Sequence, residues 1–183
     1  MLALQGDFIE HISMLRQLGA EGIPIRLPQE LEGLDGLIIP GGESTSIGKL
    51  MMEYNLTPRI KELISKGIPV LGTCAGMILL ANKVHDLNHQ PLGAIDIEVR
   101  RNAFGRQVDS FEVDLPIPVL GEAPFHAIFI RAPWIENSGA KVEILARLPN
   151  GIPVAARENN VVVSAFHPEL TSDPRFHAYF LSI

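Results

Sequence analysis

Residues 68–81 have the sequence IPVLGTCAGMILLA, in which one apolar run leads through a turn into another. The first run, residues 68–71, predicts a buried strand, and the second, residues 77–81, predicts a helix. Cys74 is the only cysteine of the chain and lies between them, with a glycine two residues away on each side. Small neighbours permit the strained turn of a nucleophile elbow, which exposes the side chain at its tip. The positive end of the helix favours the thiolate form. The stretch therefore predicts a strand–helix unit and a nucleophile that attacks an acyl carbon.

Strand and helix patterns alternate through the first half of the chain. We expect strands at residues 1–4, 23–27, 36–39 and 68–71. Between them, one helix is expected from Asp7 to about Gly19 and another from Thr57 to about Gly67. This alternation predicts an α/β fold with a mostly parallel central sheet and helices on both faces.

The second half of the chain is richer in strand patterns. Candidate strands lie at residues 94–99, 127–130, 142–146, 154–157 and 161–166, and a final helix is expected at 174–181. Residues 84–126 give the weakest pattern. Neither a repeat nor a linker interrupts the sequence, so we expect a single domain over residues 1–183.

Length and composition bound the class of protein. The chain has 183 residues, of which 46% are hydrophobic and 20% charged, as is ordinary for a globular protein. Its net charge of −6 argues against nucleic acid as a partner. No run reaches the roughly 18 apolar residues of a membrane span, and the first residues lack the features of a secretory signal. One cysteine cannot form an internal disulfide. We therefore expect a cytoplasmic protein that binds neither nucleic acid nor membrane.

A histidine and a glutamate follow the last predicted strand. Residues 164–169 read SAFHPE, and they come directly after the apolar run 161–163. In extended chain, residues two apart point the same way, so His167 and Glu169 are expected to face one direction. The carboxylate then fixes the imidazole tautomer and leaves the other ring nitrogen for a thiol. Because the carboxyl ends of parallel strands meet at one edge of a sheet, the sequence predicts a triad of Cys74, His167 and Glu169.

Attack on a carbonyl creates an oxyanion that needs N–H donors. The N–H of Ala75, directly after the nucleophile, is one candidate, and the glycine turn at residues 40–44 is another. Each feature also has an ordinary structural interpretation, since a lone cysteine is usually a small buried apolar residue and a Gly-Gly pair is usually a turn. The remaining histidines are expected to be surface or structural residues. No group has the spacing of metal ligands, so neither a metal nor a cofactor is expected.

On these motifs the chain resembles the class I glutamine amidotransferases, which share a Gly-x-Cys-x-Gly elbow and a late His-x-Glu. Within that group it is similar to the glutaminase subunits of pyridoxal 5′-phosphate synthase. The similarity covers essentially the whole chain, although both of its ends are a few residues short for the family. The resemblance implies the flavodoxin-like fold of that class. Its specific stretches are residues 2–6 (LALQG), 40–45 (PGGEST), 72–76 (GTCAG), 101–107 (RNAFGRQ), 129–133 (FIRAP) and 164–170 (SAFHPEL).

The resemblance implies hydrolysis of L-glutamine to glutamate and ammonia through a γ-glutamyl thioester on Cys74. With the donors considered above, we expect Gly42 and Ala75 to form the oxyanion hole. The resemblance also implies a partner, a (β/α)8-barrel synthase subunit that uses the ammonia to build pyridoxal 5′-phosphate, which is then a product and not a cofactor. The residues implied to bind glutamine are Gly42, Glu43, Ser44, Arg101, Ile130 and Arg131.

Three other functions compete with this one. A cysteine-dependent α/β-hydrolase places its acid between nucleophile and histidine, whereas here the acid follows the histidine by two residues. A stress-response or chaperone-like relative with a similar elbow lacks the late His-x-Glu. An inactive regulatory subunit predicts a damaged triad, whereas Cys74, His167 and Glu169 are all present.

Overall fold

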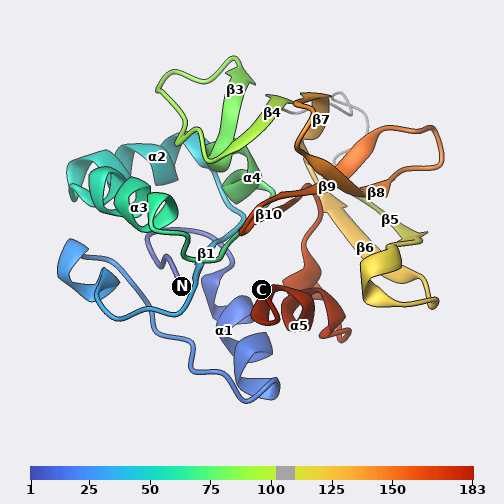
Figure 1. The fold of residues 1–183 in the computed structure, drawn as a ribbon, viewed down its shortest axis with the longest axis horizontal. Coiled ribbons are helices and arrows are strands. Elements are labelled where there is room, and N and C mark those ends of the chain that lie inside the picture. Colours follow the sequence, from blue (N-terminus) through green and yellow to red (C-terminus); the bar gives the residue numbers. More distant parts are fainter. Residues whose placement is uncertain (102–109) are drawn as a thin grey trace.

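The apolar strands around Cys74 form the centre of the molecule (Figure 1). The structure is a computed structural model that describes residues 1–101 and 110–183. Three central strands pair in parallel and are buried along their length, and two further strands extend the sheet in antiparallel pairing. The order across the sheet is β1 (Leu37–Ile39), β2 (Val70–Thr73), β10 (Val161–Ser164), β9 (Pro153–Glu158) and β8 (Glu143–Arg147). The three parallel strands are those predicted from their continuous apolar runs, because strands covered on both faces need no polar side.

The two strands predicted at the N-terminus are reduced to a single bridge. Leu2 pairs in parallel with Ile25, and the Leu2 N–H donates to the Ile38 carbonyl at 2.9 Å. This segment therefore continues the parallel part of the sheet beside β1. Pro24 has no N–H to donate, which limits the length of the pairing.

Helices cover both faces of the sheet, as predicted. In the view of Figure 1, α1 and α5 lie together below the central strands, and α2 and α4 lie above them. The helix predicted with Thr57 as its N-cap and Pro58 as its first residue begins two residues earlier, at Leu56, after Asn55 in a left-handed conformation. The helix after Glu43 is missing from the sequence analysis. The bounds are α1 (Phe8–Gln17), α2 (Ser44–Glu53), α3 (Leu56–Ser65), α4 (Ala75–Leu80) and α5 (Arg175–Leu181).

The second half adds two small sheets that sequence patterns identify only in part. The predicted strands at 94–99 and 127–130 correspond to β4 (Ile95–Arg100) and β6 (Phe125–Ile130). Their partners are unpredicted, and the sheet orders are β3-β4-β7 and β5-β6. These partners are β3 (Ala81–His85), β5 (Ser110–Leu115) and β7 (Trp134–Ser138), and the short 3-10 turns are η1 (Pro28–Leu31), η2 (Pro118–Leu120) and η3 (Pro168–Leu170). Residues 102–107 of the predicted motif RNAFGRQ lie outside the described residues.

Four buried phenylalanines fix the segment between β10 and η3. Phe166 lies with its ring centroid 5.7 Å from those of Phe125 and Phe129 and 5.3 Å from that of Phe176. Aromatic pairs at these distances each stabilise a fold by about 0.5–1.5 kcal/mol beyond their buried area. The packing therefore anchors the backbone immediately before His167. Among the residues that the structure describes, each helix falls short of the length and apolar character needed to cross a bilayer.

Candidate active site

Cys74 occupies the strained elbow that the sequence predicts. It joins the end of β2 to the start of α4 with φ 48° and ψ −100°, and its N–H donates to the Ser164 carbonyl of β10 at 2.8 Å. Positive φ is rare for residues with a side chain and persists where the surroundings enforce it. The flanking glycines are required by close contact, since a Cβ on Gly76 would lie 2.0 Å from the Ile39 carbonyl oxygen and one on Gly72 would lie 2.7 Å from the Gly76 carbonyl carbon.

The side chain of Cys74 lines a cavity of about 390 Å³. Only 7% of Cys74 is exposed. The sequence predicts an exposed side chain at the tip of the elbow, whereas the structure directs the side chain into this cavity and not into open solvent. The cavity contains His167 and the six residues expected to bind substrate, together with three that the sequence analysis missed: Gln5, Asp7 and Ile78. Its lining is Gln5, Asp7, Gly42, Glu43, Ser44, Cys74, Ile78, Arg101, Ile130, Arg131 and His167.

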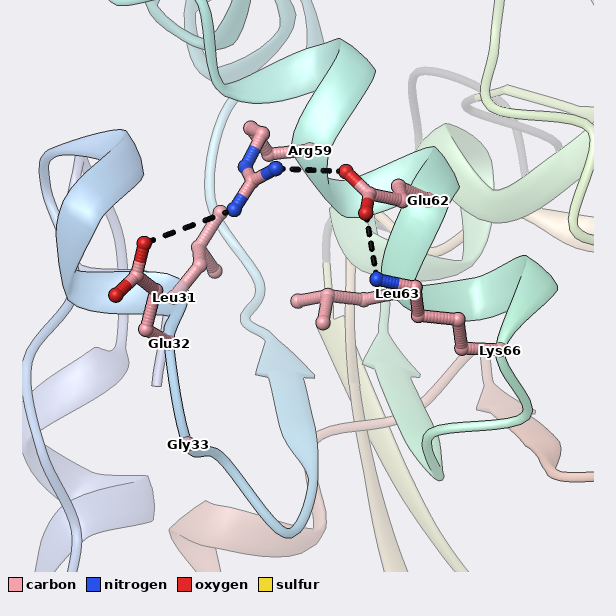
Figure 2. Close-up of a pocket in the computed structure, with 7 residues that line it drawn as sticks. All are labelled: Leu31, Glu32, Gly33, Arg59, Glu62, Leu63 and Lys66. Carbon is pink, nitrogen blue, oxygen red and sulfur yellow. Dashed lines mark hydrogen bonds and ion pairs between the residues drawn. The ribbon is translucent and has the colours of Figure 1, made fainter.

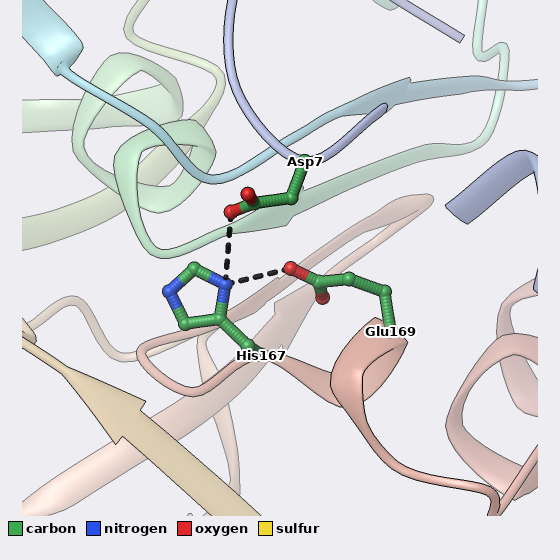
Figure 3. Close-up of side chains that lie close together, drawn as sticks. All are labelled: Asp7, His167 and Glu169. Carbon is green, nitrogen blue, oxygen red and sulfur yellow. Dashed lines mark hydrogen bonds and ion pairs between the residues drawn. The ribbon is translucent and has the colours of Figure 1, made fainter. Parts of the chain in front are cut away.

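His167, at the wall of this cavity, is paired with Glu169, and both residues are buried. Figure 3 shows the His167 Nδ1 atom facing a carboxylate oxygen of Glu169, at 2.6 Å, and one of Asp7, at 3.4 Å. The reason given from sequence for this pairing, an extended segment, is wrong. Residues 168–170 form the 3-10 turn η3, so the Glu169 side chain turns back toward the ring. A hydrogen bond from the His167 N–H to the Ile128 carbonyl, at 2.8 Å, holds the histidine against β6.

The charge of His167 follows from its contacts. Burial alone lowers its pKa, but hydrogen bonds with Cys74 and Glu169 and the charges of both outweigh burial and raise the pKa of His167 to about 10. Burial raises the pKa of Glu169, and the contact with His167 acts in the opposite direction. Since Nδ1 is directed at Glu169, Nε2 is the nitrogen left to exchange a proton with the thiol.

The N-terminal segment supports the glycine turn. A Cβ on Gly6 would lie 1.8 Å from the Gly41 carbonyl oxygen, and the Asp7 N–H donates to that oxygen at 3.3 Å. The Gln5 side-chain oxygen accepts from the Glu43 N–H at 2.8 Å. Gly42 has φ +145°, a conformation that favours glycine. The turn is therefore held in place by residues 5–7, a role that no pattern in the sequence signals.

The two candidate oxyanion donors are the N–H groups of Ala75 and Gly42. Ala75 is the first residue of α4, where backbone N–H groups have no acceptor within the helix. Gly42 lines the cavity at the end of the turn after β1. The positive end of α4 and a glycine N–H can both serve a developing negative charge.

Glu43 and Arg101 form the polar side of the cavity. The Glu43 carboxylate caps α2 by accepting from the N–H groups of Thr45 and Ser46, and Arg101 lies 3.3 Å from it. Burial acts to raise the pKa of Glu43, but hydrogen bonds from the Ser46 hydroxyl and the two N–H groups lower it to about 2. Glu43 therefore stays negatively charged and can attract a cation. Arg131 has φ 42° and supplies positive charge beside Ile130.

Within residues 1–101 and 110–183, two groups of side chains could be considered for a metal ion. One is Asp7, His167 and Glu169, in which Glu169 already occupies the histidine Nδ1. The other is formed by His85, Glu98 and Glu136 on the β3-β4-β7 sheet, where Lys83 and Arg100 pair with the carboxylates. Sequence spacing does not reveal the second group, because its members come from three strands. In both groups, ion pairs within the group or with neighbouring side chains account for the closeness of the ligand atoms.

A second hollow, of about 240 Å³, lies between η1 and α3 (Figure 2). Its charged side chains pair with one another: Arg59 lies 2.8 Å from Glu62 and 3.8 Å from Glu32, and Lys66 lies 2.6 Å from Glu62. These side chains are between 41% and 75% exposed. No cysteine or histidine lines this hollow, so its chemistry is that of a solvated surface.

Comparisons with known proteins give one consistent family. The model of the SNO glutamine amidotransferase family matches residues 1–183. The protein "Pyridoxal 5'-phosphate synthase subunit PdxT" of Moorella thermoacetica is 56% identical over 183 residues, covering 100% of this chain and 97% of the relative. The protein of the same name from Herpetosiphon aurantiacus is 56% identical over 186 residues, covering 100% and 98%. A solved structure titled "Crystal structure of glutamine amidotransferase" has a TM-score of 0.93 at 49% identity, covering 99% of this chain and 95% of that one. The predicted fold is thereby confirmed.

Proposed function

Because this chain belongs to the SNO glutamine amidotransferase family, we propose that Cys74, His167 and Glu169 are the residues with which it hydrolyses the side-chain amide of L-glutamine. One observation carries the assignment. The strained Cys74 and His167 line one cavity at the carboxyl ends of β2 and β10, and the His167 Nδ1 atom lies 2.6 Å from the buried carboxylate of Glu169. A nucleophile, a base and a group that orients the base are the parts that acyl transfer requires.

The reaction proceeds by two transfers of the acyl group. The Cys74 thiolate attacks the amide carbon, and the carbonyl oxygen becomes an oxyanion that the N–H groups of Gly42 and Ala75 stabilise. His167 gives the proton on Nε2 to the leaving nitrogen, so that ammonia departs and a γ-glutamyl thioester remains. His167 then takes a proton from water, the resulting hydroxide attacks the thioester, and glutamate and the Cys74 thiolate are released. Glu169 holds the ring in the required tautomer throughout.

The polar side of the cavity suits the amino-acid end of glutamine. The negative Glu43 faces the α-ammonium group, and Arg101 and Arg131 face the α-carboxylate. Ser44, Gly42 and Ile130 complete the cavity near the chain of the substrate. We propose these six residues as the glutamine-binding set, with the side-chain amide directed at Cys74.

We further propose that the chain supplies ammonia to pyridoxal 5′-phosphate synthase. Two relatives at 56% identity carry that name as subunits, and a (β/α)8-barrel synthase subunit is the proposed partner. The full length, residues 1–183, acts as one glutaminase domain, which a hydrophobic core shared by both halves supports. A nucleophilic thiol needs a reducing compartment, which favours the cytoplasm.

The test is an ammonia-release assay on the full chain with and without the synthase subunit. Wild-type protein is expected to release ammonia and glutamate in equal amounts and to be labelled once, at Cys74, by an electrophilic glutamine analogue. Labelling of any other residue, with activity retained in Cys74→Ala, would show that the assigned nucleophile is wrong.

A further inference from the structure

Two histidines that the mechanism leaves unused form a buried chain behind the proposed triad. The His11 Nδ1 atom of α1 lies 2.8 Å from the His177 Nε2 atom of α5. The other ring nitrogen of His11, Nε2, lies 3.1 Å from the Thr73 hydroxyl and 3.3 Å from the Glu169 Oε2 atom. His11, His177 and Thr73 are all 0% exposed. Both histidines are among those expected from the sequence to be surface or structural residues, and both lie in the interior.

The contacts of His11 connect two parts of the triad. Thr73 ends β2 and immediately precedes Cys74, while Glu169 orients His167 from η3. His11 therefore bridges the strand that carries the nucleophile and the turn that carries the carboxylate. His11 lies on α1, which is separate from both β2 and η3, so its contacts add a tertiary link between these two elements.

Donor and acceptor chemistry selects one tautomer. Burial lowers the pKa of His11 well below its usual range, with the charge of His177 and then that of His167 adding to the effect. Burial also lowers the pKa of His177, to about 4, so both rings are neutral and each carries one N–H. If the proton of His11 were on Nδ1, the lone pair on its Nε2 atom would face the negative Glu169 carboxylate. His177 would then carry its own proton on Nδ1, and His177 Nδ1 has no hydrogen-bond partner among the described residues.

The opposite tautomer satisfies the contacts of His11 and leaves His177 Nδ1 as an unpaired acceptor and not as an unpaired donor. His177 Nε2–H donates to His11 Nδ1, and His11 Nε2–H is directed at Thr73 and Glu169. Glu169 Oε2 is buried and has no hydrogen bond within the described part of the chain, whereas Oε1 is bound by His167. His11 thus brings an N–H group to within 3.3 Å of the unpaired oxygen of the carboxylate. A buried carboxylate with one unpaired oxygen is held poorly unless such a donor faces it.

We propose that His11, held in place by His177, is a positioning residue that fixes Glu169 through its second carboxylate oxygen and fixes the end of β2 through Thr73. The inference rests on the proposed triad and adds two residues to it. His11 acts through Glu169 and Thr73 and touches neither glutamine nor the reacting atoms.

The experiment compares two amides at position 11 in the full chain, assayed with the synthase subunit. The amide nitrogen of His11→Gln replaces Nε2, and that of His11→Asn replaces Nδ1, so only the glutamine keeps a donor toward Glu169 and Thr73. We expect kcat to fall roughly tenfold in His11→Asn and to stay within about threefold of wild type in His11→Gln, with KM for glutamine within about twofold in both. His126→Asn, on the exposed surface of β6, is the matched control and should leave kcat and KM unchanged.

Equal kcat in the two amide variants, a larger loss in the glutamine variant, or a change confined to KM would overturn the proposal. Should His11→Asn fail to fold, Thr73→Val decides, because it replaces the hydroxyl by a methyl group of similar size and so removes the hydrogen bond. It is expected to lower kcat about threefold at constant KM, and an unchanged kcat refutes the bridge. Cys74→Ala in the same assay distinguishes a failure of the proposed triad from a failure of the His11 proposal. If Cys74→Ala stays active, the triad is wrong. If it is inactive and the two amide variants have equal kcat, only the role of His11 is wrong.

Discussion

The Cys74 cavity and the hollow beside Arg59 both contain charged side chains, but they hold those charges in different ways. Around Arg59, acidic and basic groups are exposed, pair with one another and have long side chains in water (Figure 2). Around Cys74, the histidine and the glutamate are buried, the cysteine backbone is strained, and the nearby turn is held by close backbone contact. Burial raises the energetic effect of each charge, because water no longer screens it. Reactive chemistry therefore belongs to the Cys74 cavity and not to the hollow beside Arg59.

The largest effect is expected from removing the sulfur. Cys74→Ala should lower the rate of ammonia release by roughly 10⁴-fold or more, because among the described residues Cys74 brings the only thiol to the cavity. The measurement is glutamine turnover with the synthase subunit present, together with circular dichroism to show that the fold persists. If turnover stayed within tenfold of wild type, the Cys74 cavity could no longer be distinguished from the hollow beside Arg59 as the site of the reaction.

The two partners of Cys74 should rank in a definite order. His167→Asn is expected to lower kcat by roughly 10³-fold, because it removes both base and acid. Glu169→Gln should lower kcat less, by roughly 10–100-fold, because the base remains and only its orientation and charge support are weakened. Steady-state kinetics of both variants check the ranking, and a Glu169→Gln loss that exceeds that of His167→Asn would contradict it.

A pH effect on stability follows from the charge of His167. Burial opposes the shift, but contacts with Cys74 and Glu169 raise the pKa of His167 to about 10 in the folded chain, against about 6.5 for an unperturbed histidine. The folded state therefore keeps a proton between these values that the unfolded state loses. The stabilisation is fully present below about pH 6.5 and is lost as the pH rises toward 10.

Urea unfolding at several pH values measures this effect. The free energy of unfolding of wild type, minus that of His167→Asn, should be largest near pH 6 and smaller near pH 10. Arg59→Ala serves as the reference, since its difference from wild type should change little over the same range. A difference for His167 that grows with pH would show that the sign is wrong.

The smallest effect is expected in the hollow of Figure 2. Arg59→Ala removes ion pairs to Glu62 and Glu32, yet these pairs are exposed and screened. We expect kcat, KM and the melting temperature to stay close to those of wild type. A substantial loss of glutaminase activity in this variant would mean that the second region contributes to function after all.

Sequence patterns predicted the parts of the structure that depend on local chemistry. Buried parallel strands have continuous apolar runs, and the elbow needs small residues two positions from Cys74, so β2, β10 and α4 could be predicted. The helix α2 was missed because its cap, Glu43, follows two glycines that suggest a turn, and because Gly48 lies within it. The strand β3 was missed because it begins at Ala81, directly after α4 ends at Leu80, and no glycine or proline marks the change from helix to strand.

The candidate site was predicted where a residue type is itself the signal. Cys74, His167 and Glu169 have recognisable chemistry at strand ends, whereas Gln5 and Asp7 enter the site only because the N-terminal segment packs on the glycine turn. His11 and His177 meet across 166 positions of sequence, a proximity that no spacing rule reveals. Side chains brought together by long-range packing are visible only in the folded structure.

The φ angle of 48° at Cys74 has a consequence for attempts to engineer this chain. Glycine tolerates that conformation better than a residue with a Cβ, so replacing the cysteine by glycine relieves strain of about 1–3 kcal/mol. A library selected only for survival at high temperature would therefore enrich glycine at this position and recover robust but inert proteins. Thermal selection on this scaffold needs a simultaneous demand for ammonia production, since heat resistance and turnover favour opposite residues at the same backbone position.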